Sequence, residues 1–97
     1  MEWNAHTRIK AEEGIVACEI SDGSALLNLS TSRYYKLNET AGLLWQELEQ
    51  SNHRCRTLDE LCETLARHYD IEKTTCRSDV CQLFEGFAKS NLVRIEN

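Results

Sequence analysis

The stretch that decides the fold is residues 26–48, which read LLNLSTSRYYKLNETAGLLWQEL. Its first half has two short runs with strand-like composition on either side of a Ser-Thr-Ser turn, which is typical of an antiparallel hairpin. Its second half changes to a helical period, with apolar residues at i, i+3, i+4 and i+7. These residues are Ala41, Leu44, Trp45 and Leu48. Asn38 fits a helix N-cap and Glu39 fits the first turn, so a strand is predicted to lead directly into an amphipathic helix.

Towards the N-terminus, the sequence predicts a hairpin that adds one more strand. Residues 15–20 and 25–29 are apolar runs on either side of Asp22-Gly23, a pair that favours a type I′ turn. The third predicted strand is residues 33–37, whose side chains alternate between two faces of the sheet. Three antiparallel strands in chain order are therefore expected before the first helix.

Towards the C-terminus, two further helices are predicted after a polar connection over residues 49–56. Thr57 and Glu60 form a capping box at the start of the first of them. Its apolar stripe consists of Leu58, Leu61, Cys62, Leu65 and Tyr69. The last helix begins between Lys73 and Ser78, and its inner side consists of Cys76, Val80, Leu83, Phe84 and Phe87. Asn91 fits a left-handed residue after this helix, and residues 92–95 form a short strand or extended tail.

The order of these elements predicts an α+β fold, with a three-stranded antiparallel sheet followed by three helices. The helices would cover one face of the sheet, in an arrangement like a winged helix-turn-helix. A length of 97 residues allows one domain, so residues 1–97 are expected to form a single domain.

Composition and charge exclude several classes of function. The net charge is −5, which disfavours binding to nucleic acid. No apolar run approaches the length of a membrane span, and residues 1–10 lack the apolar segment of a signal peptide, so a cytoplasmic protein is predicted. The five cysteines contain no CxxC pair and the three histidines show no ligand spacing, so neither a metal nor another cofactor is expected. No motif indicates catalysis.

Two interpretations of a binding surface follow from the residues. A winged-helix DNA-binding regulator would read bases with the last helix, but its outward side chains mix acids with bases. They are Arg77, Asp79, Gln82, Glu85 and Lys89. The other surface is the edge of the third strand. Either Arg33 and Lys36 protect this edge, or an extended peptide adds to it as a further strand. The residues alone leave both interpretations of this edge open.

Several motifs resemble the PqqD-like family, the peptide recognition elements of ribosomal peptide biosynthesis. In residues 26–48 they are Leu26–Leu29, the run Tyr34-Tyr35-x-Leu37-Asn38, Ala41-Gly42 and Leu44-Trp45. Farther on they are Leu58, Leu61, Leu65, Tyr69-Asp70-Ile71, Asp79-Val80-x-x-Leu83-Phe84-x-x-Phe87 and Asn91-Leu92. The resemblance covers about residues 15–95 and is strongest to the stand-alone recognition proteins of lasso-peptide pathways. It departs at Asn91, where the family usually has glycine.

The resemblance implies a non-catalytic adaptor that binds the leader segment of a precursor peptide as an added strand. The adaptor would present the precursor to a transglutaminase-like cysteine protease and an ATP-dependent macrocyclase, or, in other branches of the family, to a radical SAM enzyme. The peptide-binding residues implied are Arg33, Tyr34, Tyr35, Lys36, Asp79, Leu83 and Phe87. Of these, Tyr35 and Phe87 also fit a purely structural role in the core.

Overall fold

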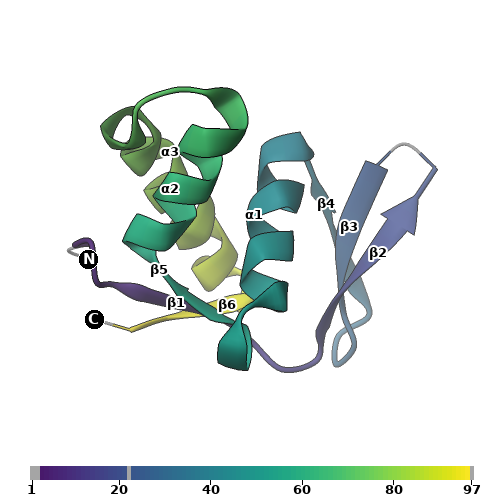
Figure 1. The fold of residues 1–97 in the computed structure, drawn as a ribbon. Coiled ribbons are helices and arrows are strands. Elements are labelled where there is room, and N and C mark those ends of the chain that lie inside the picture. Colours follow the sequence, from purple (N-terminus) through teal and green to yellow (C-terminus); the bar gives the residue numbers. More distant parts are fainter. Residues whose placement is uncertain (1–2, 22, 97) are drawn as a thin grey trace.

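The computed structural model describes residues 3–21 and 23–96, and Figure 1 shows its fold. The first half consists of β1 (Arg8–Ala11), β2 (Ile15–Ile20), β3 (Gly23–Asn28), β4 (Arg33–Leu37) and α1 (Glu39–Gln50). The second half consists of a 3-10 turn, η1 (Asn52–Arg54), β5 (Cys55–Thr57), α2 (Leu58–Tyr69), α3 (Lys73–Lys89) and β6 (Val93–Glu96). The predicted α+β class with three helices is confirmed.

The strands form two antiparallel sheets rather than the single sheet that was predicted. One has the order β2-β3-β4, as expected from the chain order, and the other has the order β5-β1-β6. The second sheet was missed because β1, β5 and β6 have only three or four residues each and come from distant parts of the chain. Part of the predicted connection at 49–56 is thus a strand. The comparison with a winged helix-turn-helix remains a prediction.

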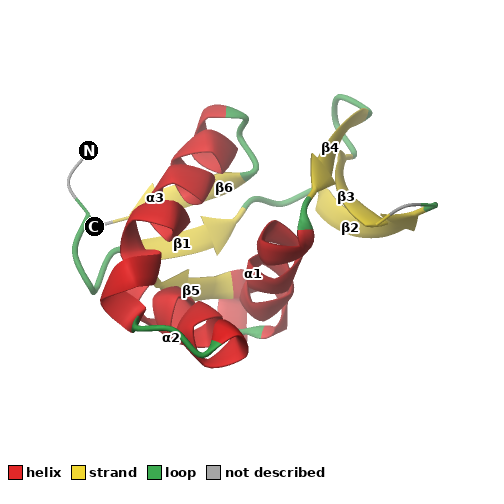
Figure 2. Ribbon diagram, turned by 90° about the horizontal axis from the view of Figure 1, so that it is seen from above, coloured by secondary structure: helices red, strands yellow, loops and turns green. Residues whose placement is uncertain are grey.

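The helices lie over the β5-β1-β6 sheet, and the β2-β3-β4 sheet stands beside α1 at the end away from both termini (Figures 1 and 2). One hydrophobic core joins all of these layers. Trp45 of α1, Phe84 of α3 and Ile9 of β1 are among its largest fully buried side chains. Burying each such side chain stabilises the fold by about 1.5–3 kcal/mol, so the core holds the two sheets and three helices together.

The helix boundaries follow local signals. The Asn38 side chain accepts a hydrogen bond from the Ala41 N–H at 2.8 Å, which confirms the predicted N-cap. Asn91 has a φ of +61°, as the prediction of a left-handed residue requires. Tyr69 is exposed rather than part of the buried stripe of α2, because it lies on the last turn. Asp22 of the predicted turn lies outside the described residues, and Gly23 after it has a φ of +144°.

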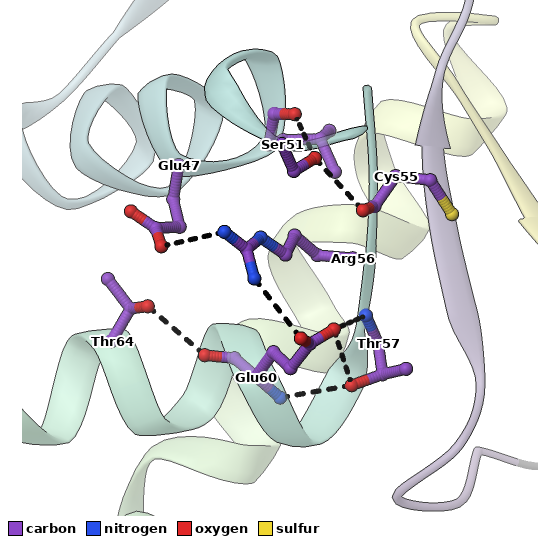
Figure 3. Close-up of polar contacts among 8 residues, drawn as sticks. Glu47, Ser51, Cys55, Arg56, Thr57, Glu60 and Thr64 are labelled. Atoms are coloured by element: carbon purple, nitrogen blue, oxygen red, sulfur yellow. Dashed lines mark hydrogen bonds and ion pairs between the residues drawn. The ribbon is translucent and has the colours of Figure 1, made fainter. Parts of the chain in front are cut away.

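The start of α2 is tied to the end of α1 by a polar cluster (Figure 3). Thr57 and Glu60 form the predicted capping box, with the Thr57 N–H donating to Glu60 Oε1 at 2.9 Å. Arg56 bridges the two helices, because its guanidinium lies 3.5 Å from a carboxylate oxygen of Glu47 and 3.1 Å from one of Glu60. The cluster therefore links α1, β5 and the first turn of α2.

This capping box predicts a pH-dependent contribution to stability. The hydrogen bond from the Thr57 N–H lowers the pKa of Glu60 below its ordinary value. The contribution is therefore present above the pKa of the unfolded chain, about 4.3, and is lost as the pH falls through the lower pKa of folded Glu60. We expect Glu60→Gln to lower the free energy of unfolding by about 0.5 kcal/mol at pH 7, because Glu60 is largely exposed.

Urea unfolding of both proteins at pH 7 and pH 3 checks this expectation. The difference between them should shrink as the pH falls, because Glu60 takes up a proton and loses the charge that its hydrogen bonds stabilise. A difference that grows on acidification would contradict it. Thr64→Ala serves as the control, since Thr64 lies on the same helix and its hydroxyl donates only to the Glu60 carbonyl oxygen.

Candidate functional site

The candidate site begins at the edge of the β2-β3-β4 sheet. Among the described strands, β4 pairs only with β3, so its other side is a sheet edge. The edge position expected for residues 33–37 is therefore correct. In Figure 1, β4 lies between β3 and α1, with its C-terminal end leading directly into that helix.

The hydrogen-bond pattern decides which backbone groups of β4 face this edge. The Leu29 N–H donates to the Gly14 carbonyl at 2.8 Å, so the backbone of Leu29 faces β2. Because backbone groups alternate in direction along a strand, Leu26 and Asn28 face β4 instead. Their partners in the register are Tyr35 and Arg33. Tyr34 lies between these two partners, and Lys36 follows Tyr35. The backbone N–H and carbonyl groups of Tyr34 and Lys36 therefore point away from β3.

The side chains of β4 divide between solvent and the core. Tyr34 is 63% exposed, and Arg33 and Lys36 are also exposed. Tyr35 is half-buried and packs against the core, and Leu37 is buried at the end of the strand. Tyr34 therefore offers both an outward backbone and an accessible ring, whereas the Tyr35 ring also supports the sheet.

A hollow of about 240 Å³ lies between the start of α1 and the middle of α3. Its floor is apolar, from Ala41, Leu44, Leu65 and Val80. Asn38 and Thr40 add polar atoms near the end of β4, and Asp79 and Leu83 add an acid and an aliphatic side chain from α3. The hollow can therefore hold an apolar side chain and place a basic one near Asp79.

The structure thus brings two of the predicted α3 residues to the hollow and gives the third a different position. Phe87 is half-buried, and its ring packs edge-on against Trp45 at a centroid distance of 6.2 Å and against Phe84 at 5.7 Å. Phe87 is not among the residues that line the hollow. Phe84 and Val80 are buried, as the apolar stripe indicated.

Sequence reasoning missed the residues that complete the hollow from α1 and α2. Asn38 was identified only as a helix cap, although it also lines the hollow. Thr40 lies beside it, 3.3 Å from the Tyr69 hydroxyl. Leu65 comes from α2 and carried no signal beyond its place in an apolar stripe, because its contribution depends on how three helices meet.

Two of the cysteines, Cys62 and Cys76, belong to the packed core. All five are free thiols, and Cys62 and Cys76 are buried, as their places in apolar stripes predicted. Burial raises the pKa of Cys62 to about 11 and also raises that of Cys76. A thiol with a raised pKa is a weak nucleophile at neutral pH. Within residues 3–21 and 23–96, no group of three or more histidine, cysteine or acidic side chains could hold a metal ion.

The fold and the site together define a small α+β domain with a sheet edge open beside an apolar hollow. The family model for coenzyme PQQ synthesis protein D (PqqD) matches residues 23–93. This span is most of the chain, and the chain therefore belongs to the PqqD family. No curated protein matches the chain. In the described part of the chain, no helix is long and apolar enough to cross a membrane.

Two solved structures have the same fold. One, described as TbiB1 in complex with the TbiA(beta) leader peptide, is 22% identical with a TM-score of 0.74, and the match covers 88% of this chain and 94% of that chain. The other, a lasso peptide synthetase B1 complexed with the leader peptide, is 21% identical with a TM-score of 0.72. That match covers 89% of this chain and 96% of the other.

Proposed function

We propose that this chain is a non-catalytic adaptor that binds the leader segment of a ribosomal precursor peptide as a strand added to β4. The observation that carries the proposal is the outward backbone of Tyr34, at a sheet edge whose end meets the hollow of Asp79 and Leu83. Strand addition supplies affinity through main-chain hydrogen bonds, and adjacent pockets supply specificity. Membership of the PqqD family and the leader peptides bound in two structures of the same fold support this assignment.

The proposed roles of the seven predicted residues follow from their positions. Tyr34 contributes its N–H and carbonyl to the leader strand, and Lys36 continues the ladder. Arg33 and Tyr35 direct their backbone towards β3, so they act by holding β4 in register. In α3, Leu83 contacts an apolar leader side chain and Asp79 a basic one. Phe87 supports this part of α3 through its contact with Trp45.

The proposed adaptor presents the bound precursor, in the cytoplasm, to enzymes encoded separately. For a lasso-peptide pathway these are a transglutaminase-like cysteine protease and an ATP-dependent macrocyclase. In another branch of the family the partner is a radical SAM enzyme, and the genes next to that of this chain distinguish the two. A DNA-binding regulator is disfavoured, because the net charge of −5 would repel a phosphate backbone.

A titration followed by NMR tests the proposal. The probe is the synthetic leader of the precursor peptide encoded nearest to the gene of this chain, with a scrambled peptide as control. We expect amide shifts along residues 33–37 and at Asp79 and Leu83, with a dissociation constant near 1 μM, or about −8 kcal/mol. Hydrogen exchange at the Tyr34 amide should also slow on binding. Saturating leader without any shift along residues 33–37 would overturn the proposal.

A further inference from the structure

The opposite edge of the same sheet is also open. Among the described strands, β2 pairs only with β3. Gly14, just before β2, directs its backbone carbonyl towards Leu29. Because backbone groups alternate in direction along a strand, those of Ile15, Ala17 and Glu19 point away from β3. The Ile15 carbonyl accepts a hydrogen bond from Arg54 Nη2 at 2.9 Å, as expected for a group that points outwards. Ala17 and Glu19 are exposed, and their backbone groups face solvent.

Of the features that usually prevent strand addition, this edge has only one inward-pointing charge, Glu19. Natural edge strands are protected by lysine, proline, bulges or a covering segment. The sequence of β2, IVACEI, contains neither lysine nor proline, and Glu19 is its one charged residue. Val16 and Ile20 are each 37% exposed on the sheet face opposite Ala17 and Glu19. β4 differs, since it carries Arg33 and Lys36.

The inner face beside this edge is acidic. A groove of about 830 Å³ lies between the β2-β3-β4 sheet and α1, and Ala17, Leu37 and Trp45 contribute apolar surface to it. Glu19 from β2 and Glu39 and Glu49 from α1 line it, against one base, Lys36. Arg54 forms an ion pair with Glu49, with 3.8 Å between Arg54 Nη2 and Glu49 Oε1. Within residues 3–21 and 23–96, no ion pair involves Glu19 or Glu39. The groove therefore favours a positively charged occupant.

We propose that the free edge of β2 is a second strand-addition site, which takes an extended, basic segment of a partner protein other than the precursor. Side chains of an added strand alternate between the two sheet faces. Those above the groove would be lysine or arginine, facing Glu19 and Glu39. Those on the other face would be apolar, beside Val16 and Ile20. The required pattern is thus an alternation of basic and apolar residues over about five positions.

A second copy of this chain is a poorer occupant of the same edge. Pairing two β2 strands would bring two acidic grooves together, and each copy carries a net charge of −5. Like charges across neighbouring strands are destabilising. Charge complementarity therefore favours a basic segment from a different protein over a homodimer.

The experiment uses the full chain and two synthetic heptapeptides. One alternates valine with lysine, and the other alternates valine with glutamate. By NMR, the basic peptide should shift the amides of residues 16–20 and of Gly42 and Gln46, and the acidic peptide should not. In Glu19→Gln/Glu39→Gln we expect about tenfold weaker binding, whereas the matched control Glu63→Gln/Glu96→Gln should change it less than twofold. Ala17→Pro, which removes one outward N–H, should abolish binding.

Each outcome decides the proposal. Equal binding of the two peptides, or basic-peptide binding that survives in the neutralised variant, would overturn it. If Ala17→Pro fails to fold, the neutralised variant decides alone. A dimer in sedimentation equilibrium that becomes tighter in the neutralised variant would assign the edge to a second copy and overturn the partner assignment. Leader binding at β4 should be the same in every variant as in the wild-type chain. Its loss in a variant alone would overturn the separation of the two edges. A leader that fails to bind the wild-type chain as well contradicts only the proposed function.

Discussion

Tyr34→Pro is expected to weaken leader binding at least about 30-fold while the domain remains folded. The outward N–H of Tyr34 would donate to the leader strand, and proline has no N–H. The loss of one main-chain hydrogen bond costs about 1 kcal/mol, and the proline ring would also keep the leader from approaching the edge. Proline is tolerated at an edge strand where the N–H faces solvent, so the β3–β4 ladder should survive.

Tyr34→Ala is the matched variant, because it removes the same ring and keeps the N–H. We expect it to weaken leader binding about threefold to tenfold. Isothermal titration calorimetry on both variants separates the backbone from the side chain, and far-UV circular dichroism checks the fold. If both variants bind the leader equally well, strand addition at this position is wrong.

Phe84→Ala should mainly lower the stability of the domain, whereas Leu83→Ala, at the next position on α3, should mainly weaken leader binding. Phe84 is fully buried and its ring contacts Phe87, so truncation should lower the free energy of unfolding by about 3–5 kcal/mol. Small domains are stable by only about 5–15 kcal/mol, so this loss is a large part of the total. Leu83 is half-buried at the hollow, so its truncation should cost about 1 kcal/mol of stability and weaken leader binding about tenfold.

Urea unfolding and calorimetry on both variants, below the unfolding transition of the less stable one, measure these effects. Ala88→Gly is a control for general weakening of α3, since Ala88 is absent from the hollow and glycine lowers helix stability by about 1 kcal/mol. The assignment of the hollow fails if Leu83→Ala and Ala88→Gly reduce leader affinity by the same factor.

The fold could be predicted wherever the signal was local. The helix at 39–50 follows from the period of its apolar residues and from the Asn38 cap, and the helix at 58–69 follows from its capping box. The β5-β1-β6 sheet could not be predicted. Its strands are too short to show alternation, and each is held by partners that lie dozens of residues away. Hydrogen bonds between distant segments leave little trace in the local pattern.

The class of the domain, its family resemblance and the strand that carries Tyr34 could all be recognised from the amino-acid sequence. Hydrophobic period, capping residues and turn residues act within a few positions, so they can be recognised along the chain. The structure was needed to show that Asp79 and Leu83 share a hollow with Asn38, while Phe87 packs against Trp45. It was also needed to show that, among the described strands, nothing pairs with either edge of the β2-β3-β4 sheet, and that an acidic groove lies beside the β2 edge. These features depend on how helices and strands pack against each other, because packing over long sequence distances selects which side chains of an apolar stripe face the core and which remain accessible.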